Sequence, residues 1–124
     1  MTGLFSDTFR WELRRYAMGS RWHLYAGEVE TPFFLDLAGA KERRFRSTPI
    51  ALCAAGLCPY TGAAATLAGY RRIDAAKARA EALWREWTAS GELERRAAAG
   101  EKARRALYAR HRRNDDGSLM QKVA

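Results

Sequence analysis

The chain has 124 residues and a mass of 14.0 kDa, which is enough for one small domain and too little for two. Hydrophobic residues make up 48% and charged residues 29%, a balance that excludes a disordered or collagen-like chain. Lys and Arg outnumber Asp and Glu by 22 to 14, so the net charge is +8. This charge favours negatively charged partners such as nucleic acid, anionic lipid or acidic protein surfaces.

Residues 1–46 form a first segment that is basic and rich in aromatic rings. Apolar residues at helical spacing predict a short amphipathic helix, which begins at Ser6 or Asp7 and ends near Gly19. Such a helix can lie in a membrane interface or pack on a partner subunit, and the sequence does not separate these two roles. Residues 24–39 show no clean period, so we expect an extended segment there, or a short helix from Pro32 onward. The apolar face of the predicted amphipathic helix consists of Phe9, Leu13, Tyr16 and Ala17.

Residues 47–70 contain no charged side chain, and this run of 24 residues is the longest of its kind in the chain. As a helix, the 22 residues from Pro49 to Tyr70 would span about 33 Å, close to the thickness of about 30 Å of a bilayer's hydrocarbon core. The flanks are basic and suit anionic lipid headgroups. The sequence therefore predicts a single transmembrane helix over residues 47–70. The predicted headgroup contacts are Arg43, Arg44, Arg46, Arg71 and Arg72.

Small residues are frequent in this predicted span, and four of them share one helical face. Small side chains allow neighbouring membrane helices to approach closely, so we expect this face to pack on another helix. The alternative is a buried, Ala-rich helical hairpin in a soluble protein, because Ala and Gly insert poorly into membranes and Pro59 lies at the centre of the span. The predicted helix-packing residues are Gly62, Ala65, Thr66 and Gly69.

Residues 71–113 are dominated by Ala, Arg, Glu, Lys and Leu, which favour helix, and we expect a long charged helix with a break near residues 90–91. One stripe at helical spacing is apolar and predicts the buried face. The tail, residues 114–124, has turn chemistry at its start. The apolar stripe consists of Ala76, Ala80, Leu83, Trp84 and Trp87.

Catalytic and metal-binding motifs are not found in the sequence. Cys53 and Cys58 are five residues apart, which on one helix points them away from each other and does not match a CxxC site. His23 and His111 have no partner at ligand spacing. We therefore predict no catalytic activity, no metal and no cofactor.

The order of features from about Arg43 to the C-terminus resembles subunit e of the mitochondrial ATP synthase, in the segments RRFRS, GLCPYTGAAATLAGYRR, DAAKARAEALWREW and ELERRAAAGEKARRALYARHRR. The GxxxG of that family is missing here, and the first 40 or so residues have no counterpart. The resemblance implies a non-catalytic accessory subunit in the mitochondrial inner membrane that assists dimer association. Its implied partners are other membrane subunits and anionic phospholipid such as cardiolipin.

The sequence thus predicts an all-α protein with a single transmembrane helix, an amphipathic or extended N-terminal segment and a long charged C-terminal helix. Three classes of function stay open. The first is an accessory subunit of ATP synthase or of another respiratory complex, which needs no nucleic acid. The second is an Arg-rich ribosomal protein that binds RNA, and the third is a small helical interaction module.

Overall fold

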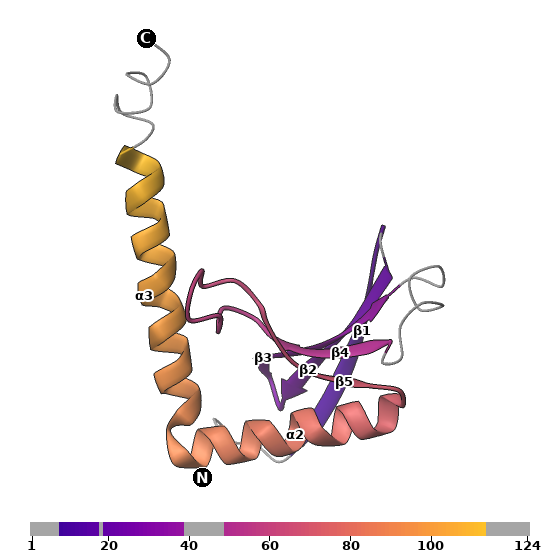
Figure 1. The fold of residues 1–124 in the computed structure, drawn as a ribbon. Coiled ribbons are helices and arrows are strands. Elements are labelled where there is room, and N and C mark those ends of the chain that lie inside the picture. The colour runs from indigo at the N-terminus through magenta and orange to yellow at the C-terminus, as the bar shows by residue number, and fades with distance from the viewer. Residues whose placement is uncertain (1–7, 18, 39–48, 114–124) are drawn as a thin grey trace.

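Five antiparallel strands form one sheet, in which each strand pairs with its neighbours in sequence (Figure 1). The computed structural model describes residues 8–17, 19–38 and 49–113. The strands are followed by two helices, which are separated by a single residue, Gly91. The elements are β1 (Phe9–Tyr16), β2 (Gly19–Ala26), β3 (Val29–Ala38), β4 (Ile50–Ala54), β5 (Ala65–Tyr70), α2 (Ile73–Ser90) and α3 (Glu92–Arg113).

The strands follow an alternation of apolar and polar residues that is clearest in β1 and β2. Successive side chains of a strand point to opposite faces of a sheet, so Phe9, Trp11 and Leu13 of β1 share one face, and Arg10, Glu12 and Arg14 share the other. The register places Trp11 opposite Leu24 on the first face, and Glu12 opposite His23 on the second. We call these the inner face and the outer face.

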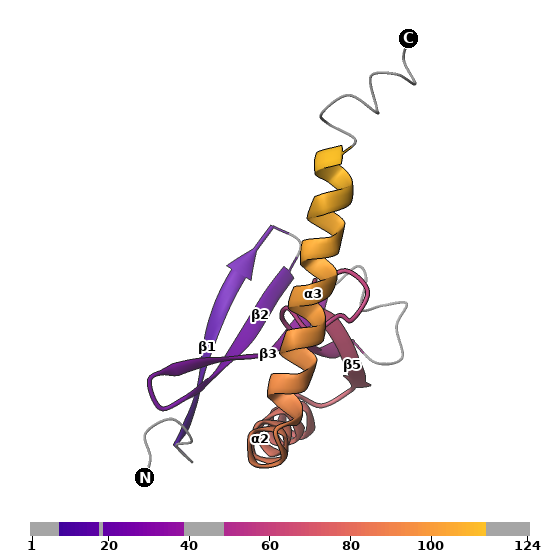
Figure 2. The same ribbon diagram turned by 90° about the vertical axis from the view of Figure 1, so that its left-hand side faces the viewer.

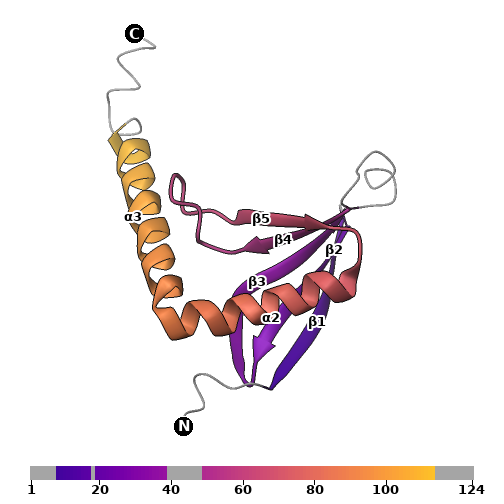
Figure 3. The same cartoon turned by 60° about the horizontal axis from the view of Figure 1, so that its bottom comes forward.

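Helix α2 crosses the inner face and closes the core (Figure 3). Its buried residues follow the spacing i, i+4, i+7 and i+8 of one helical face. Trp11 donates a hydrogen bond from Nε1 to Glu81 Oε2 at 2.9 Å, and the Lys77 ammonium lies 4.1 Å from the centre of the Trp22 ring. The main buried residues are Leu24, Phe33, Leu35, Ile50 and Leu52 from the sheet, and Ala76, Ala80, Leu83 and Trp84 from α2.

The predicted transmembrane helix is wrong, because residues 50–70 form the hairpin of β4 and β5. Gly56 and Gly62 adopt positive φ angles in the connecting loop, and Pro59 lies between them, so the chain turns back instead of continuing as a helix. The run is uncharged because β4 is buried under α2 and the loop packs on α3. Among the helices of the described residues, none combines the length and hydropathy needed to cross a membrane.

The all-α fold class is therefore overturned, and so is the expectation of a transmembrane subunit of ATP synthase, which depended on that span. The predicted amphipathic helix of the N-terminal segment is also wrong over its described part, where β1 stands. Its apolar residues at positions 9, 11 and 13 fit the two-residue period of a strand better than a helical period. Within residues 24–39, the end of β2 and the whole of β3 are extended and are joined by a turn at Gly27 and Glu28, and the alternative helix after Pro32 does not form.

The charged C-terminal region is helical and is interrupted at the predicted position. Helix α2 ends at Ser90, Gly91 adopts a left-handed conformation with φ 79°, and α3 begins at Glu92. Four residues of the predicted apolar stripe are buried on α2, and Trp87 packs beside them with its ring centre 5.4 Å from that of Phe33. Residues 114–124, the predicted tail, lie outside the described residues.

Candidate functional site

Helix α3 turns away from α2 at Gly91, rises past the loop between β4 and β5, and extends beyond the sheet (Figures 1 and 2). Its first half is fixed by contacts with that loop. A Cβ atom at Gly100 would collide with the carbonyl oxygen of Gly56, and one at Gly62 would lie 2.5 Å from the carbonyl oxygen of Gly100. Only glycine at these positions allows the helix and the loop to approach so closely.

Beyond Gly100, α3 is stabilised mainly by its own sequence. Eight of the residues 101–113 are Ala or Arg, both good helix formers, and no further helix or strand packs heavily on them within the described chain. Glu101 pairs with Arg104 and accepts a hydrogen bond from Arg105 Nε at 2.9 Å, which are the i, i+3 and i, i+4 partners. Basic residues near a helix C-terminus are also favoured by the helix dipole.

Residues 102–112 contain five basic residues and no acidic residue, and we call this part of α3 the basic arm. All five basic side chains are exposed. Among the described residues, Lys102, Arg110 and Arg112 make no ion pair, whereas the other two share Glu101. The basic arm therefore has a high density of positive charge that the protein itself does not neutralise. Its basic residues are Lys102, Arg104, Arg105, Arg110 and Arg112.

These side chains are distributed around the helix axis. At about 100° per residue, Arg110 lies about 80° from Lys102, and Arg112 lies about 20° from Arg105. Arg110 and Arg112 project on nearly opposite sides of the helix, about 160° apart, and Lys102 lies between Arg110 and Arg105. Tyr108, with 59% of its surface exposed, lies near Arg104, Arg105 and Arg112 in this projection.

A pocket of about 400 Å³ lies at the base of the basic arm. Leu57, Trp84 and Leu93 contribute apolar surface to it, and Glu101 and Arg104 contribute charged groups. The first turn of the basic arm therefore borders a cavity large enough for a small molecule.

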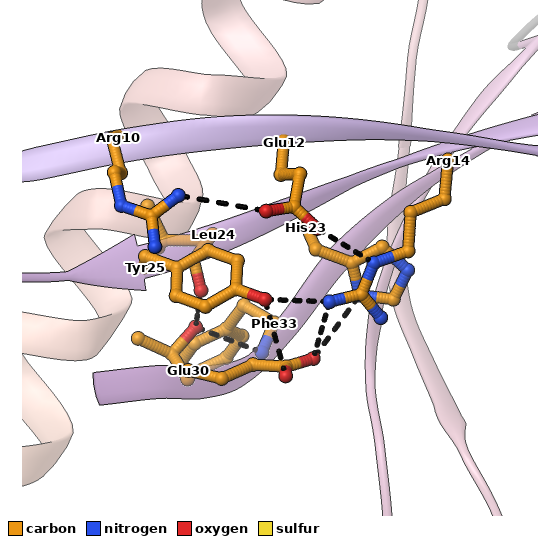
Figure 4. A network of polar contacts seen from close by, with 9 residues as sticks. Arg10, Glu12, Arg14, His23, Leu24, Tyr25, Glu30 and Phe33 are labelled. Atoms are coloured by element: carbon orange, nitrogen blue, oxygen red, sulfur yellow. Dashed lines mark hydrogen bonds and ion pairs between the residues drawn. The ribbon is translucent and has the colours of Figure 1, made fainter. Parts of the chain in front are cut away.

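The outer face of the sheet carries the other cluster of charged residues, and its charges are balanced (Figure 4). Arg14 contacts Glu12 at 3.1 Å and Glu30 at 3.4 Å, and it donates a hydrogen bond to the Tyr25 hydroxyl at 2.6 Å. The Arg14 guanidinium lowers the pKa of the Glu12 carboxyl, and the Glu12 carboxylate raises the pKa of Arg14. Three arginines and three acids alternate on this face, namely Arg10, Arg14 and Arg21 with Glu12, Glu30 and Asp36.

His23 lies beneath this network and is only 9% exposed. Its ring stacks on Phe34, with 5.4 Å between ring centres, and Nδ1 is 3.6 Å from Glu30 Oε2. Among the described residues, Nε2 is buried without a hydrogen-bond partner. Burial and the nearby Arg14 charge lower the pKa of His23, so the imidazole is held neutral. The arrangement is that of a packed core histidine under a salt-bridge network.

The two cysteines have different surroundings. Cys53 is buried on β4, with its sulfur 3.8 Å from Thr66 Oγ1, and burial raises the pKa of its thiol. Hydrogen bonds in the loop, first of all that with the Thr61 side chain, lower the pKa of Cys58. Within the described part of the chain, no group of three His, Cys, Asp or Glu residues gathers as a metal site would require.

The residues predicted to pack membrane helices do not share a helical face. Gly62 lies in the loop between β4 and β5, and Ala65, Thr66 and Gly69 are in β5. The pairing with β4 places Thr66 and Gly69 on the outer face, opposite Cys53 and Ala51, and Ala65 on the inner face, because the register shifts between Leu52 and Cys53. Gly62 does allow a close backbone approach, but its partner is α3.

The predicted headgroup contacts are divided between two parts of the chain. Arg71 and Arg72 are exposed at the junction of β5 and α2, where Arg72 is the residue that precedes the helix. Arg43, Arg44 and Arg46 lie outside the described residues. Residues 102–112 were not predicted as a site, because acids and bases are mixed over the charged region as a whole. A count over shorter windows separates the basic arm from the paired helix before it.

In comparisons with known proteins, no family model, no curated protein and no solved structure matches this chain. Its function is therefore inferred from its own residues and their geometry.

Proposed function

We propose that this protein binds nucleic acid, and double-helical DNA in particular, through the basic arm. The observation that supports this most directly is the charge of residues 102–112, five basic residues without an acid on a helix that extends beyond the sheet (Figure 2). Contacts of Lys and Arg with phosphates supply most of the affinity of non-specific nucleic-acid binding. The outer face is a poorer candidate, because its three arginines face three acids and its charges balance.

The placement of the basic residues suits a helix inserted in a groove. The major groove of B-DNA is about 12 Å wide and admits an α-helix between two sugar–phosphate backbones. Arg110 projects on one side of the basic arm, and Arg112, about 160° away around the axis, projects on the other side together with Arg105. Each backbone would therefore meet basic side chains. The major groove of A-form RNA is deep and narrow, so the same helix fits duplex RNA less well.

The residue types also favour phosphate. Four of the five basic residues are arginines, whose planar guanidinium groups donate to two oxygens at once. The exposed Tyr108 hydroxyl can donate one more hydrogen bond to the backbone. These contacts read no bases, so we expect binding that depends strongly on salt and weakly on sequence.

The test is fluorescence polarisation with a short fluorescein-labelled DNA duplex, titrated with the full chain at several KCl concentrations. The double variant Arg110→Gln/Arg112→Gln should bind more weakly, and the slope of log K against log salt should fall by about two, since each lost phosphate contact removes about 0.9 from it. The matched control is Arg15→Gln/Arg72→Gln, which removes the same charge from exposed positions outside the basic arm.

A slope that falls equally in the two double variants would attribute binding to net charge and reject the basic arm as the site. Undetectable binding of the duplex at low salt would reject the proposal altogether. Single-stranded DNA and duplex RNA serve as competitors. Preference for either over duplex DNA would reject insertion in the major groove.

A further inference from the structure

Strand β5 is an edge of the sheet, because β4 is its only partner among the described residues. The free edge presents backbone N–H and C=O groups that another strand can pair with. Natural proteins protect such edges with charged residues or proline, and β1, the opposite edge, carries Arg10, Glu12 and Arg14. β5 has the sequence ATLAGY, without a charge or a proline. Of the two edges, β5 is therefore the one suited to accept a strand.

A groove of about 270 Å³ lies along the inner side of β5. Leu67 and Tyr70 of β5 line it together with Leu83 and Trp87 of α2. When a strand is added to a sheet edge, its alternate side chains point to the inner face. An apolar side chain of an added strand would thus reach this groove, while its backbone pairs with β5.

Two arginines, Arg79 and Arg96, also line the groove, and no acidic residue does. Arg79 pairs with Glu86 at 3.2 Å, and Arg96 pairs with Glu92 at 2.6 Å. All four side chains are at least 30% exposed, and exposed pairs of this kind contribute little stability, so the arginines can exchange their partners. The charge at this groove is complementary to an acidic ligand.

We propose that β5 binds an extended, acidic segment of a partner protein, which adds a sixth strand to the sheet. An apolar residue of this segment occupies the groove, and acidic residues on the same face of the strand pair with Arg79 and Arg96. A second copy of the chain fits this surface less well, because its own net charge is +8. The inference does not depend on the binding of DNA by the basic arm.

The probe is the capped peptide TETLTET, in which the central Leu and the two Glu side chains share one face of a strand. Isotope-labelled protein is titrated with it, and amide hydrogen exchange is followed by NMR. We expect new protection confined to Ala65–Tyr70, with no change in Phe9–Tyr16. The peptide TKTLTKT should bind at least about tenfold more weakly, because it brings like charges to the arginines.

Two protein variants test the groove and its charge separately. Ala68→Phe fills the groove with a ring and should abolish binding of the acidic peptide. Arg79→Gln/Arg96→Gln leaves the groove open and should weaken binding of the same peptide. The matched control is Arg110→Gln/Arg112→Gln, which carries the same charge change on the basic arm. Equal binding of the two peptides, protection at β1, or the absence of protection would overturn the proposal. Protection of β5 that rises with protein concentration without peptide would identify a second copy as the occupant and overturn it too.

Discussion

Gly100 of α3 packs against the carbonyl oxygen of Gly56, and the contact leaves no room for a Cβ atom on the helix. It joins the helix to a loop that lies far from it in the sequence. Together with the neighbouring contact of Gly62, it fixes the base of the basic arm on the sheet. The helix has no other buried residue among those described beyond Gly91.

Gly100→Ala should therefore destabilise the protein, by about 1–3 kcal/mol, because the added methyl group meets backbone that has no rotamer to change. At an unconstrained helical position the same substitution stabilises by about 1 kcal/mol, so the two expectations have opposite signs. Urea unfolding followed by circular dichroism measures the difference. An increase in the free energy of unfolding would show that the contact is not made.

Leu52 is fully buried at the centre of β4, and Leu52→Ala should cost about 2–5 kcal/mol through lost burial and the cavity left behind. Tyr60 in the loop between β4 and β5 is 82% exposed, so Tyr60→Ala should change the free energy of unfolding by less than about 0.5 kcal/mol. Chemical denaturation of the two variants measures the free energy of unfolding lost at a buried strand residue and at an exposed loop residue. The predicted transmembrane helix placed both residues inside the membrane. Similar effects of both substitutions would therefore argue against the hairpin.

His23 should make the stability depend on pH. Its pKa is lowered in the folded state, so the folded protein favours the neutral imidazole, and the unfolded chain binds the proton more readily. The contribution of His23 is present above the unfolded pKa of about 6.5 and is lost as the pH falls below it. Arg14 and Arg21 favour the neutral form, whereas Glu30 and Glu12 oppose it.

His23→Phe keeps a ring stacked on Phe34 and removes the titrating group. The free energy of unfolding of this variant should fall less than that of the parent chain between neutral pH and pH values below about 6. The slope with pH, rather than the absolute stability, is the quantity to compare, since the substitution also alters packing.

The two thiols should differ in reactivity. The thiolate is the reactive form, and the lowered pKa of Cys58 and raised pKa of Cys53 predict that iodoacetamide labels Cys58 first at neutral pH. Peptide mass spectrometry of a time course measures both rates. Thr61→Val should slow labelling of Cys58 and leave Cys53 unchanged, because it removes the hydrogen bond that lowers the pKa of Cys58. Faster labelling of Cys53 would contradict this picture of the loop.

The helical part of the fold was accessible from the sequence, and the sheet was misread. Leu83, Trp84 and the small residues before them define a helical face without competing signals, and Gly91 marks the end of α2. In β1 the series Phe9, Trp11, Leu13 fits a strand, but Phe9, Leu13 and Tyr16 also fit a helix. A segment of eight residues is too short for the two periods to be told apart. Only the pairing with β2 decides between them.

The uncharged run misled for a different physical reason. A long segment without charge is required in lipid, but a strand, a turn built from Gly, Pro and small residues and a second strand can also follow one another without a charge, as in the hairpin of β4 and β5. Gly56, Pro59 and Gly62 were the sequence signals of a turn. Three such residues close together are stronger evidence for a hairpin than the length of the uncharged run is for a membrane helix. The basic arm could have been found by a local charge count, whereas the groove beside β5 could not, because Leu67 and Trp87 meet only in the folded chain.

The attachment of α3 at Gly91 and Gly100 has a mechanical consequence. The two points are about 13 Å apart along the helix axis, and the basic arm continues for about 18 Å beyond the second. The helix is thus held at two points, the turn after α2 and the loop that carries Gly56, and its C-terminal part extends beyond the second point. A small displacement of this loop would move the tip of the helix more than twice as far. Changes in the length or packing of the loop would therefore redirect the charged tip without altering a single basic residue on it.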